Sequence, residues 1–136
     1  MKNSKFLLLI FILIAVGIVG GCCVLNSVFP KAQPIRLPKT EEVISVQVSD
    51  SQQHSVELKN EETELLKSTL AKAVPTRKMS VNDYPAVRPY YKIEAVCLDI
   101  TYYYFVYTED NQTYIEVPYE GIYRADSQIY SIITND

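Results

Sequence analysis

A run of 20 residues without a charged side chain, Phe6 to Leu25, constrains this chain more than any other feature. It reads FLLLIFILIAVGIVGGCCVL and follows a short N-terminal segment, residues 1–5, that contains Lys2 and Lys5. An apolar run of this length can cross the hydrocarbon core of a bilayer as a helix, and it lacks the polar stripe that a helix of a soluble core shows. Lysines on the short N-terminal side predict that this side stays in the cytoplasm and the rest lies outside.

A lipoprotein signal ending at Cys22 is a second interpretation of the same run. Residues 19–22 read Val-Gly-Gly-Cys, in which an aliphatic and two small residues precede the cysteine that would receive the lipid. The apolar core of such a signal has the length found here. The apolar residues Val24 and Leu25 fit poorly, because lipoproteins usually continue with a polar tether. Both interpretations stay open, and both predict a domain anchored to the cell membrane on its extracytoplasmic side.

The charge balance beyond the anchor excludes one class of partner. With Lys2 and Lys5 in the anchor, 11 of the 13 basic residues and all 16 acidic residues follow residue 25, a formal charge near −5. Nucleic acids attract basic surfaces, so no nucleic-acid partner is predicted. Weak repulsion from anionic lipid leaves the N-terminus as the means of attachment to the membrane.

Prolines spaced four residues apart follow the anchor: Pro30, Pro34 and Pro38. Proline fixes φ and lacks a backbone donor, so this segment is expected to form an extended stalk. What remains has the length of one compact domain. The chain therefore divides into a signal or anchor segment, a stalk and an extracytoplasmic domain: residues 1–25, 26–40 and 41–136.

The first part of the domain predicts a hairpin and a helix. Residues 43–48 and 54–58 alternate between the two faces of a strand, and the polar run between them is typical of a turn. Residues 60–73 form an amphipathic pattern, with Asn60 as N-cap and Pro75 after the end. The side chains expected to face the core are Ile44, Val46, Val48, His54, Val56, Leu58, Leu65, Leu66, Thr69, Leu70 and Ala73.

Aromatic and β-branched residues dominate the rest of the chain and predict further strands. These strands are expected over residues 90–98, 101–108, 113–117 and 128–133. The predicted fold class is α+β: one amphipathic helix packed on an antiparallel sheet of about five or six strands, preceded by the N-terminal hydrophobic anchor helix.

Residue types that carry catalysis or bind metals are sparse. His54 is the single histidine, and Cys97 is the single cysteine beyond the anchor, in an apolar neighbourhood that predicts a buried, inert thiol. Gly121 is the sole glycine after the anchor, so there is no glycine-rich phosphate loop. We therefore predict no catalytic residue, no metal site and no cofactor, which favours a protein that is not an enzyme.

Tyrosine is unusually frequent, with 11 in 136 residues. Neighbouring residues of a strand point to opposite faces, so a tyrosine cluster on one strand cannot lie wholly in one core. Tyrosine offers a large contact area with a polar tip, which suits recognition. The candidate interaction surface consists of Tyr102, Tyr103, Tyr104 and Tyr107, and a half-exposed sheet that favours aromatic residues is the plain alternative.

Three segments carry a family resemblance: Asn82-Asp83-Tyr84-Pro85, Tyr103–Tyr107 and Tyr114-Ile-Glu-Val-Pro-Tyr-Glu-Gly-Ile-Tyr123. They resemble a family of small anchored or exported proteins of Gram-positive bacteria, known as domain of unknown function 5301. The resemblance spans about residues 35–133. It implies an N-terminal anchor followed by this domain, and it implies no known activity and no catalytic residue.

The last of these segments has a structural interpretation of its own. Pro118 cannot donate to a sheet, so it ends or edges a strand. Gly121 permits a positive φ at the turn that follows. Tyr119 and Tyr123 are expected to clamp this turn, which makes the segment a structural motif first.

The sequence thus favours a non-enzymatic binding or interaction module whose partner is a protein, a peptide or a wall component. The alternatives are an inhibitor or immunity-type protein and, from a different class, a small envelope hydrolase. A hydrolase would need a cleft in which carboxylates, tyrosines or His54 converge with shifted pKa values.

Overall fold

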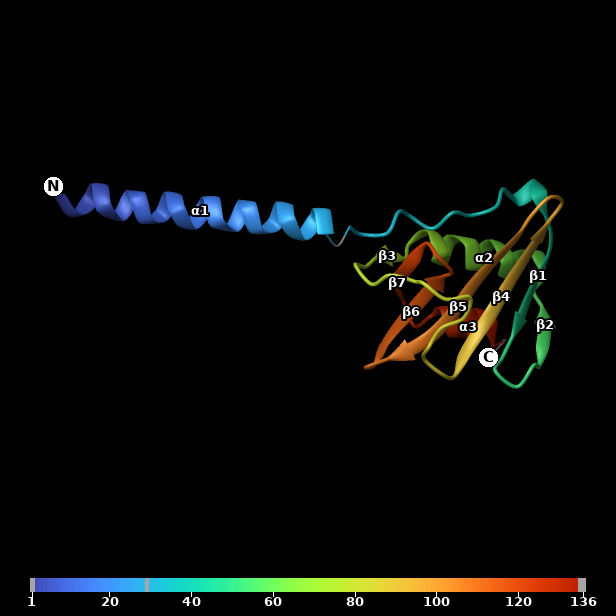
Figure 1. Ribbon diagram of the computed structural model, residues 1–136. Coiled ribbons are helices and arrows are strands. Elements are labelled where there is room, and N and C mark those ends of the chain that lie inside the picture. The colour runs from blue at the N-terminus through green and yellow to red at the C-terminus, as the bar shows by residue number, and fades with distance from the viewer. Residues whose placement is uncertain (1, 29, 135–136) are drawn as a thin grey trace. The chain divides into compact units, whose positions relative to one another are not determined.

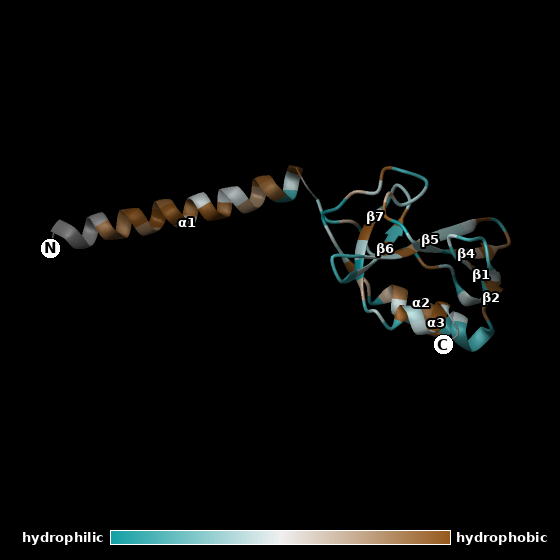
Figure 2. Ribbon diagram, turned by 90° about the horizontal axis from the view of Figure 1, so that it is seen from below, coloured by the Kyte–Doolittle hydropathy of each residue, from teal (hydrophilic) through white to brown (hydrophobic). Residues whose placement is uncertain are grey.

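The computed structural model describes residues 2–28 and 30–134, which divide into a unit ending at Lys31 and a unit beginning at Ala32. The first unit contains helix α1 (Lys2–Val28), which continues past the predicted end at residue 25. Figure 2 shows α1 as hydrophobic along most of its length. Within the described residues, α1 is the helix long and apolar enough to cross a membrane, over Leu7–Val28, a property shared by signal sequences.

The second unit is an α+β domain, as predicted (Figure 1). In the described part of the chain, seven antiparallel strands form one sheet in the order β2-β1-β4-β5-β6-β7-β3. The strands are β1 (Val43–Ser49), β2 (Ser55–Glu57), β3 (Val74–Pro75), β4 (Tyr90–Cys97), β5 (Thr101–Glu109), β6 (Gln112–Val117) and β7 (Gly121–Ala125). The helices are η1 (Thr40–Glu42), α2 (Asn60–Ala71) and α3 (Ile129–Ile133).

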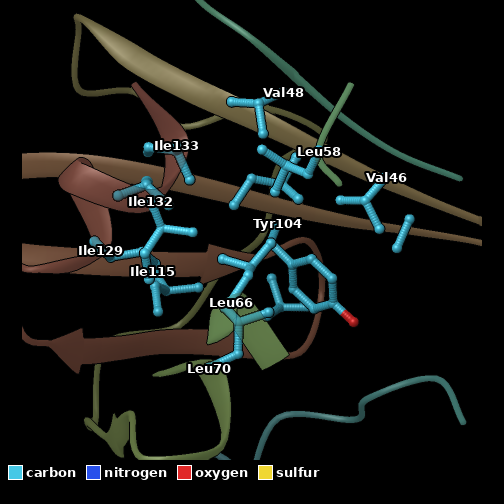
Figure 3. Close-up of a cluster of buried hydrophobic side chains, with 14 of the residues drawn as sticks. Val46, Val48, Leu58, Leu66, Leu70, Tyr104, Ile115, Ile129, Ile132 and Ile133 are labelled. Atoms are coloured by element: carbon cyan, nitrogen blue, oxygen red, sulfur yellow. The ribbon is translucent and has the colours of Figure 1, made fainter. Parts of the chain in front are cut away.

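Helices α2 and α3 lie together on one face of the sheet and cover the hydrophobic core (Figure 2). Alternate residues of the central strands point toward them, including Ile93, Tyr104 and Ile115. Leu66 and Leu70 of α2 meet these side chains (Figure 3). Burying such apolar side chains is the main stabilising contribution to a domain of this size.

Residues 129–133 form helix α3, with Gln128 as its N-cap, so the strand predicted over residues 128–133 is wrong. Ile129, Ile132 and Ile133 are buried, and their spacing of three and four residues places them on one side of a helix turned toward the core. The Asp126 carboxylate accepts a hydrogen bond from the Gln128 N–H at 2.9 Å and shapes the turn before the helix. Packing against the core has overridden the β propensity of isoleucine.

One apolar residue of β1 and one of α2 that were predicted to face the core lie at the surface. The register of β1 against β4 shifts between Val43 and Ser45, so Ile44 is the extra residue of a β-bulge and is 62% exposed. Leu65 lies on the solvent side of α2, which narrows the buried stripe to Leu66 and Leu70. The bulge shifts the alternation by one residue, which the sequence pattern does not reveal.

Strand β2 is an edge strand with every residue exposed, so Val56 does not face the core as predicted. His54 lies just before the strand and is exposed as well. Leu58, just beyond the strand, is buried. The hairpin of β1 and β2 is confirmed, with Val48 opposite Val56. The short β2 lies at the end of the sheet, where its side chains have no second layer to pack against.

Helix α2 matches the predicted helix closely, although both ends differ. Lys59 is the N-cap in place of Asn60, and the Glu62 carboxylate accepts a hydrogen bond from the Lys59 N–H at 2.7 Å. Lys72 is the C-cap, so the helix ends before residue 73. The acidic first turn still satisfies the N-terminal donors, as the sequence indicates.

The proline segment is extended, but residues 32–38 lie against the domain and do not form a free stalk. The Tyr123 hydroxyl donates to the Gln33 carbonyl at 2.7 Å, and the Tyr104 hydroxyl donates to the Arg36 carbonyl at 2.9 Å. The proline pattern predicts the extended backbone correctly. It does not predict the two core tyrosines that hold this backbone, so the compact unit begins at about residue 32 and not at 41.

Buried tyrosines predict a loss of stability in alkaline solution. Burial is the main cause that raises the pKa of Tyr104, Tyr107 and Tyr123 above the ordinary value. The buried phenols therefore contribute their full stabilisation when the pH is below the pKa of tyrosine in the unfolded chain, which is about 10. As pH rises above that value, the unfolded chain loses phenol protons that the folded chain retains, so the free energy of unfolding is expected to fall.

Urea unfolding as a function of pH, with phenolate absorbance as a second signal, tests this expectation. Tyr107→Phe is expected to lessen the slope, because the variant has one buried phenol fewer. A free energy of unfolding that stays constant well above pH 10 would contradict the prediction.

Candidate ligand-binding site

The sheet face opposite the helices is partly covered by the loop between β3 and β4, residues 76–89. Phe105 of β5 and Glu116 of β6 are buried on this face. The Ser80 hydroxyl donates to the Glu116 carboxylate at 2.7 Å, and both residues are buried. The loop therefore packs on the sheet through a polar contact that satisfies a buried carboxylate.

A pocket of about 410 Å³ opens beside this loop. It combines side chains from the loop, from the central strands β4 and β5, and from the turn between β6 and β7. Its lining residues are Asp83, Tyr84, Lys92, Tyr103, Phe105, Pro118 and Tyr119. The volume is in the range of roughly 300–1,000 Å³ that is typical of small-molecule sites.

Aromatic rings form most of the pocket wall. Tyr84, Tyr103 and Tyr119 are 54%, 42% and 65% exposed, whereas Phe105 is buried at the base. The Phe105 ring makes edge contacts with Tyr84 at 5.7 Å and with Tyr90 at 5.4 Å between ring centroids. These contacts fix Phe105 and Tyr84, so the pocket presents an ordered aromatic surface to solvent.

Tyr119 is exposed, yet both its backbone and its hydroxyl group are fixed. Its φ of +62° places the backbone in the left-handed region, which non-glycine residues rarely adopt. Its hydroxyl donates to the Asp83 carboxylate at 2.9 Å, and this hydrogen bond raises the pKa of Tyr119. Strained backbone of this kind gathers at functional sites, where the surrounding structure maintains it.

Lys92 supplies the positive charge of the pocket and is itself paired. Its Nζ lies 2.8 Å from the Glu94 carboxylate and 5.0 Å from the centre of the Tyr103 ring. Desolvation lowers the pKa of Lys92, but the hydrogen bond and charge of Glu94 outweigh it and leave that pKa raised. Lys92 therefore stays protonated, and its ammonium group interacts with one face of Tyr103.

Comparison with known proteins identifies the family of this domain. The family model DUF5301, described as a domain of unknown function (DUF5300), matches residues 31–124. The chain belongs to this family. A solved structure, described as the NMR structure of the protein from Ruminococcus gnavus, is 29% identical with a TM-score of 0.63. The similarity covers 73% of this chain and 98% of that chain. No match was found among curated proteins.

The DUF5301 domain separates the four tyrosines that the sequence grouped together. Tyr104 and Tyr107 are 2% exposed on opposite faces of β5, and Tyr102 is half-buried on the helix side. Tyr103 alone of the four lines the pocket. The predicted cluster is therefore not one interaction surface, because the alternation of a strand divides it between the face that the helices cover and the face that the loop covers in part.

The segment from Pro118 to Tyr123 is only partly the clamp that was predicted. Pro118 and Tyr119 line the pocket, whereas Tyr123 is buried and bonds to residue 33. Gly121 has a φ of +159°, and Tyr119 is the turn residue in the left-handed region. An ideal Cβ on Gly121 would lie 2.4 Å from the Ala32 Cβ, so close packing is the main reason for glycine here.

Sequence reasoning missed four residues of the pocket as site residues: Asp83, Tyr84, Lys92 and Phe105. Asp83 and Tyr84 lie in the first segment of the family resemblance and Phe105 lies in the second, so the resemblance was the signal that could have found them. The pocket in fact draws on all three segments that carry the resemblance. Segments far apart in sequence thus meet at one place on the DUF5301 domain.

The remaining chemically active residues lie elsewhere. Cys97 is buried, and burial raises the pKa of its thiol, as an inert core cysteine requires. His54 is exposed and lies 3.0 Å from the Asp50 carboxylate. Cys22 is exposed on α1. Among residues 2–28 and 30–134, no group of three or more His, Cys, Asp or Glu side chains is arranged to hold a metal ion.

Proposed function

We propose that the chain is a membrane-anchored binding module of the cell envelope, which binds its ligand in the aromatic pocket. The observation that carries the proposal is Tyr119, an exposed ring held by a left-handed backbone and by Asp83. Holding an exposed aromatic side chain in this way costs free energy through backbone strain, and the packing of the core does not require it. A binding site gains affinity from such a ring, because a ring that is already fixed loses little entropy when the ligand binds.

The chemistry of the pocket supports binding more than catalysis. The ionisable groups Asp83 and Lys92 already have partners, the Tyr119 hydroxyl and Glu94. A general acid or base must reach the reacting atom with an available proton or lone pair. Paired groups of this kind favour the positioning of a ligand, which agrees with a non-enzymatic module.

The anchored, extracytoplasmic placement rests on the apolar span of α1, Leu7–Val28, and on Lys2 and Lys5, which precede that span in the sequence. Leu7–Val28 is exposed along its length and carries no charged residue. Positive residues on the short N-terminal side favour retention of that side in the cytoplasm. The DUF5301 domain then faces the outside, where it can meet wall components, peptides or the outer parts of membrane proteins.

A photo-crosslinking amino acid at position 103 tests the binding function in the native cells. Tyr103 is a good site because its side chain lines the pocket and is exposed. We expect discrete crosslinked products from position 103 in the full-length protein. Position 65 is the matched control, because Leu65 lies on the helix side and is at least as exposed as Tyr103. Equal or absent crosslinking at the two positions would contradict the proposal.

We expect Cys22→Ser to leave the protein anchored and unprocessed. The apolar residues Val24 and Leu25 after Cys22 fit the polar tether of a lipoprotein poorly, and this favours an uncleaved membrane helix. One hydroxyl near the outer end of such a helix is tolerated. Labelling with a clickable fatty acid and intact mass are the measurements, with the wild type expected to be unlabelled and to retain its N-terminus. Label on the wild type that disappears in Cys22→Ser would instead establish a lipoprotein.

A further inference from the structure

We propose that the aromatic pocket binds the ring of a neutral saccharide, an inference that rests on the proposed binding function. A sugar ring presents apolar C–H groups on its faces and hydroxyl groups around its rim. The pocket presents a matching arrangement, in which exposed tyrosine rings offer faces for the C–H groups. Tyrosine hydroxyls, Asp83 and Lys92 lie where they can bond to the rim.

The charges of the pocket favour a neutral ligand. A cationic ligand would compete with Lys92, which already lies 5.0 Å from the Tyr103 ring. An anionic ligand would be repelled by the carboxylates of Asp83 and Glu94. Lys92 would not offset this repulsion, because its charge is already paired with Glu94. Burying an unpaired charge beside such groups is costly. A ligand that carries hydroxyl or amide groups avoids both costs.

The place of the pocket in the sheet favours a ring over an extended peptide. Its base is formed by β4 and β5, the third and fourth of the seven strands in the described sheet. Peptides that add a strand need a free sheet edge, which is absent at these paired central strands. A volume of about 410 Å³ suits one or two compact units of a ligand.

Tyr119 is the side chain expected to stack on the sugar. Its two attachments, the left-handed backbone and the bond to Asp83, hold the ring without covering it. Tyr119→Phe keeps the ring and removes the bond to Asp83, whereas Tyr119→Ala removes the ring. Comparing these two variants therefore separates stacking from positioning by the hydroxyl.

The test uses the full chain in lipid nanodiscs with two probes, triacetylchitotriose and cellotriose. Saturation-transfer NMR and isothermal titration calorimetry measure binding. We expect at least one probe to bind, with Tyr119→Ala and Tyr103→Ala weakening it roughly tenfold. Tyr119→Phe is expected to lose less, and Leu65→Ala is expected to bind as the wild type does. Circular dichroism and thermal unfolding establish that each variant is folded.

Two results would overturn the saccharide assignment. One is saccharide binding that is unchanged in folded Tyr119→Ala and Tyr103→Ala. The other is the lack of binding of both saccharides, and binding of decaproline or choline that these variants weaken would then identify the class of ligand. In the second case the position-103 crosslinks remain and the binding function stands with another ligand. Loss of saccharide binding together with loss of those crosslinks would remove both proposals.

Discussion

Leu66→Ala is expected to lower the free energy of unfolding by about 2–5 kcal/mol. Leu66 is 2% exposed and lies among Leu70, Tyr104 and other side chains of the core beneath α2 (Figure 3). Truncation removes its buried methyl groups and leaves a cavity, because the rigid sheet can collapse into the space only in part. Urea unfolding followed by circular dichroism measures the change.

Leu65→Ala is the matched control, because it removes the same atoms from the same helix. Leu65 is 55% exposed, so the change is expected to remain within about 0.5 kcal/mol. The sequence pattern places both leucines on the packing stripe, and the structure assigns only Leu66 to the core. Equal midpoints for the two variants would mean that the packing face of α2 is wrong.

The parts of the fold that follow from local chemistry could be predicted from the sequence. Helix α2 has acidic residues in its first turn and ends before Pro75, and both signals lie within a few residues of the helix. The turn before β6 has polar residues at its tip, and Asp110 and Asn111 adopt positive φ there. These two residue types tolerate that conformation better than most others, which makes such turns visible in a sequence.

The elements that were missed depend on contacts between distant residues. Whether residues 128–133 form a strand or a helix is decided by the core that receives Ile129 and Ile132. The bulge at Ile44 depends on its pairing with β4. Strand β7 begins at Gly121, where the sequence indicates only a turn, and β3 has two residues. Single-sequence periodicity carries no information about any of these partners.

The candidate site depends even more on contacts between residues that are distant in the sequence. Tyr103 and Tyr119 were singled out from composition and from the family segment. Their common pocket could not be inferred, because the loop that brings Asp83 and Tyr84 beside them contains no periodic pattern. The charge pair of Lys92 and Glu94 was equally invisible, since it lies two residues apart along one strand and looks like ordinary surface charge.

Gly121→Ala is expected to destabilise the domain by about 1–3 kcal/mol or more, as overpacking does. The new Cβ would lie 2.4 Å from the Ala32 Cβ, and real Cβ atoms do not approach one another so closely. The Ala32 methyl group is attached directly to the backbone and cannot rotate away. The extended segment that Tyr104 and Tyr123 hold must therefore shift, which weakens their hydrogen bonds to it.

Ala32→Gly is expected to restore much of this loss when combined with Gly121→Ala. Without the Ala32 Cβ, the nearest Ala32 atom is its Cα at 3.7 Å, an ordinary van der Waals distance. A residual cost is expected because alanine rarely adopts the φ of +159° at position 121. A double-mutant cycle of unfolding free energies measures the coupling, which for residues in direct contact is typically about 0.5–3 kcal/mol. If the two changes are additive, the close approach of residues 32 and 121 is not what requires glycine, and the segment before η1 is not held against the domain at this point.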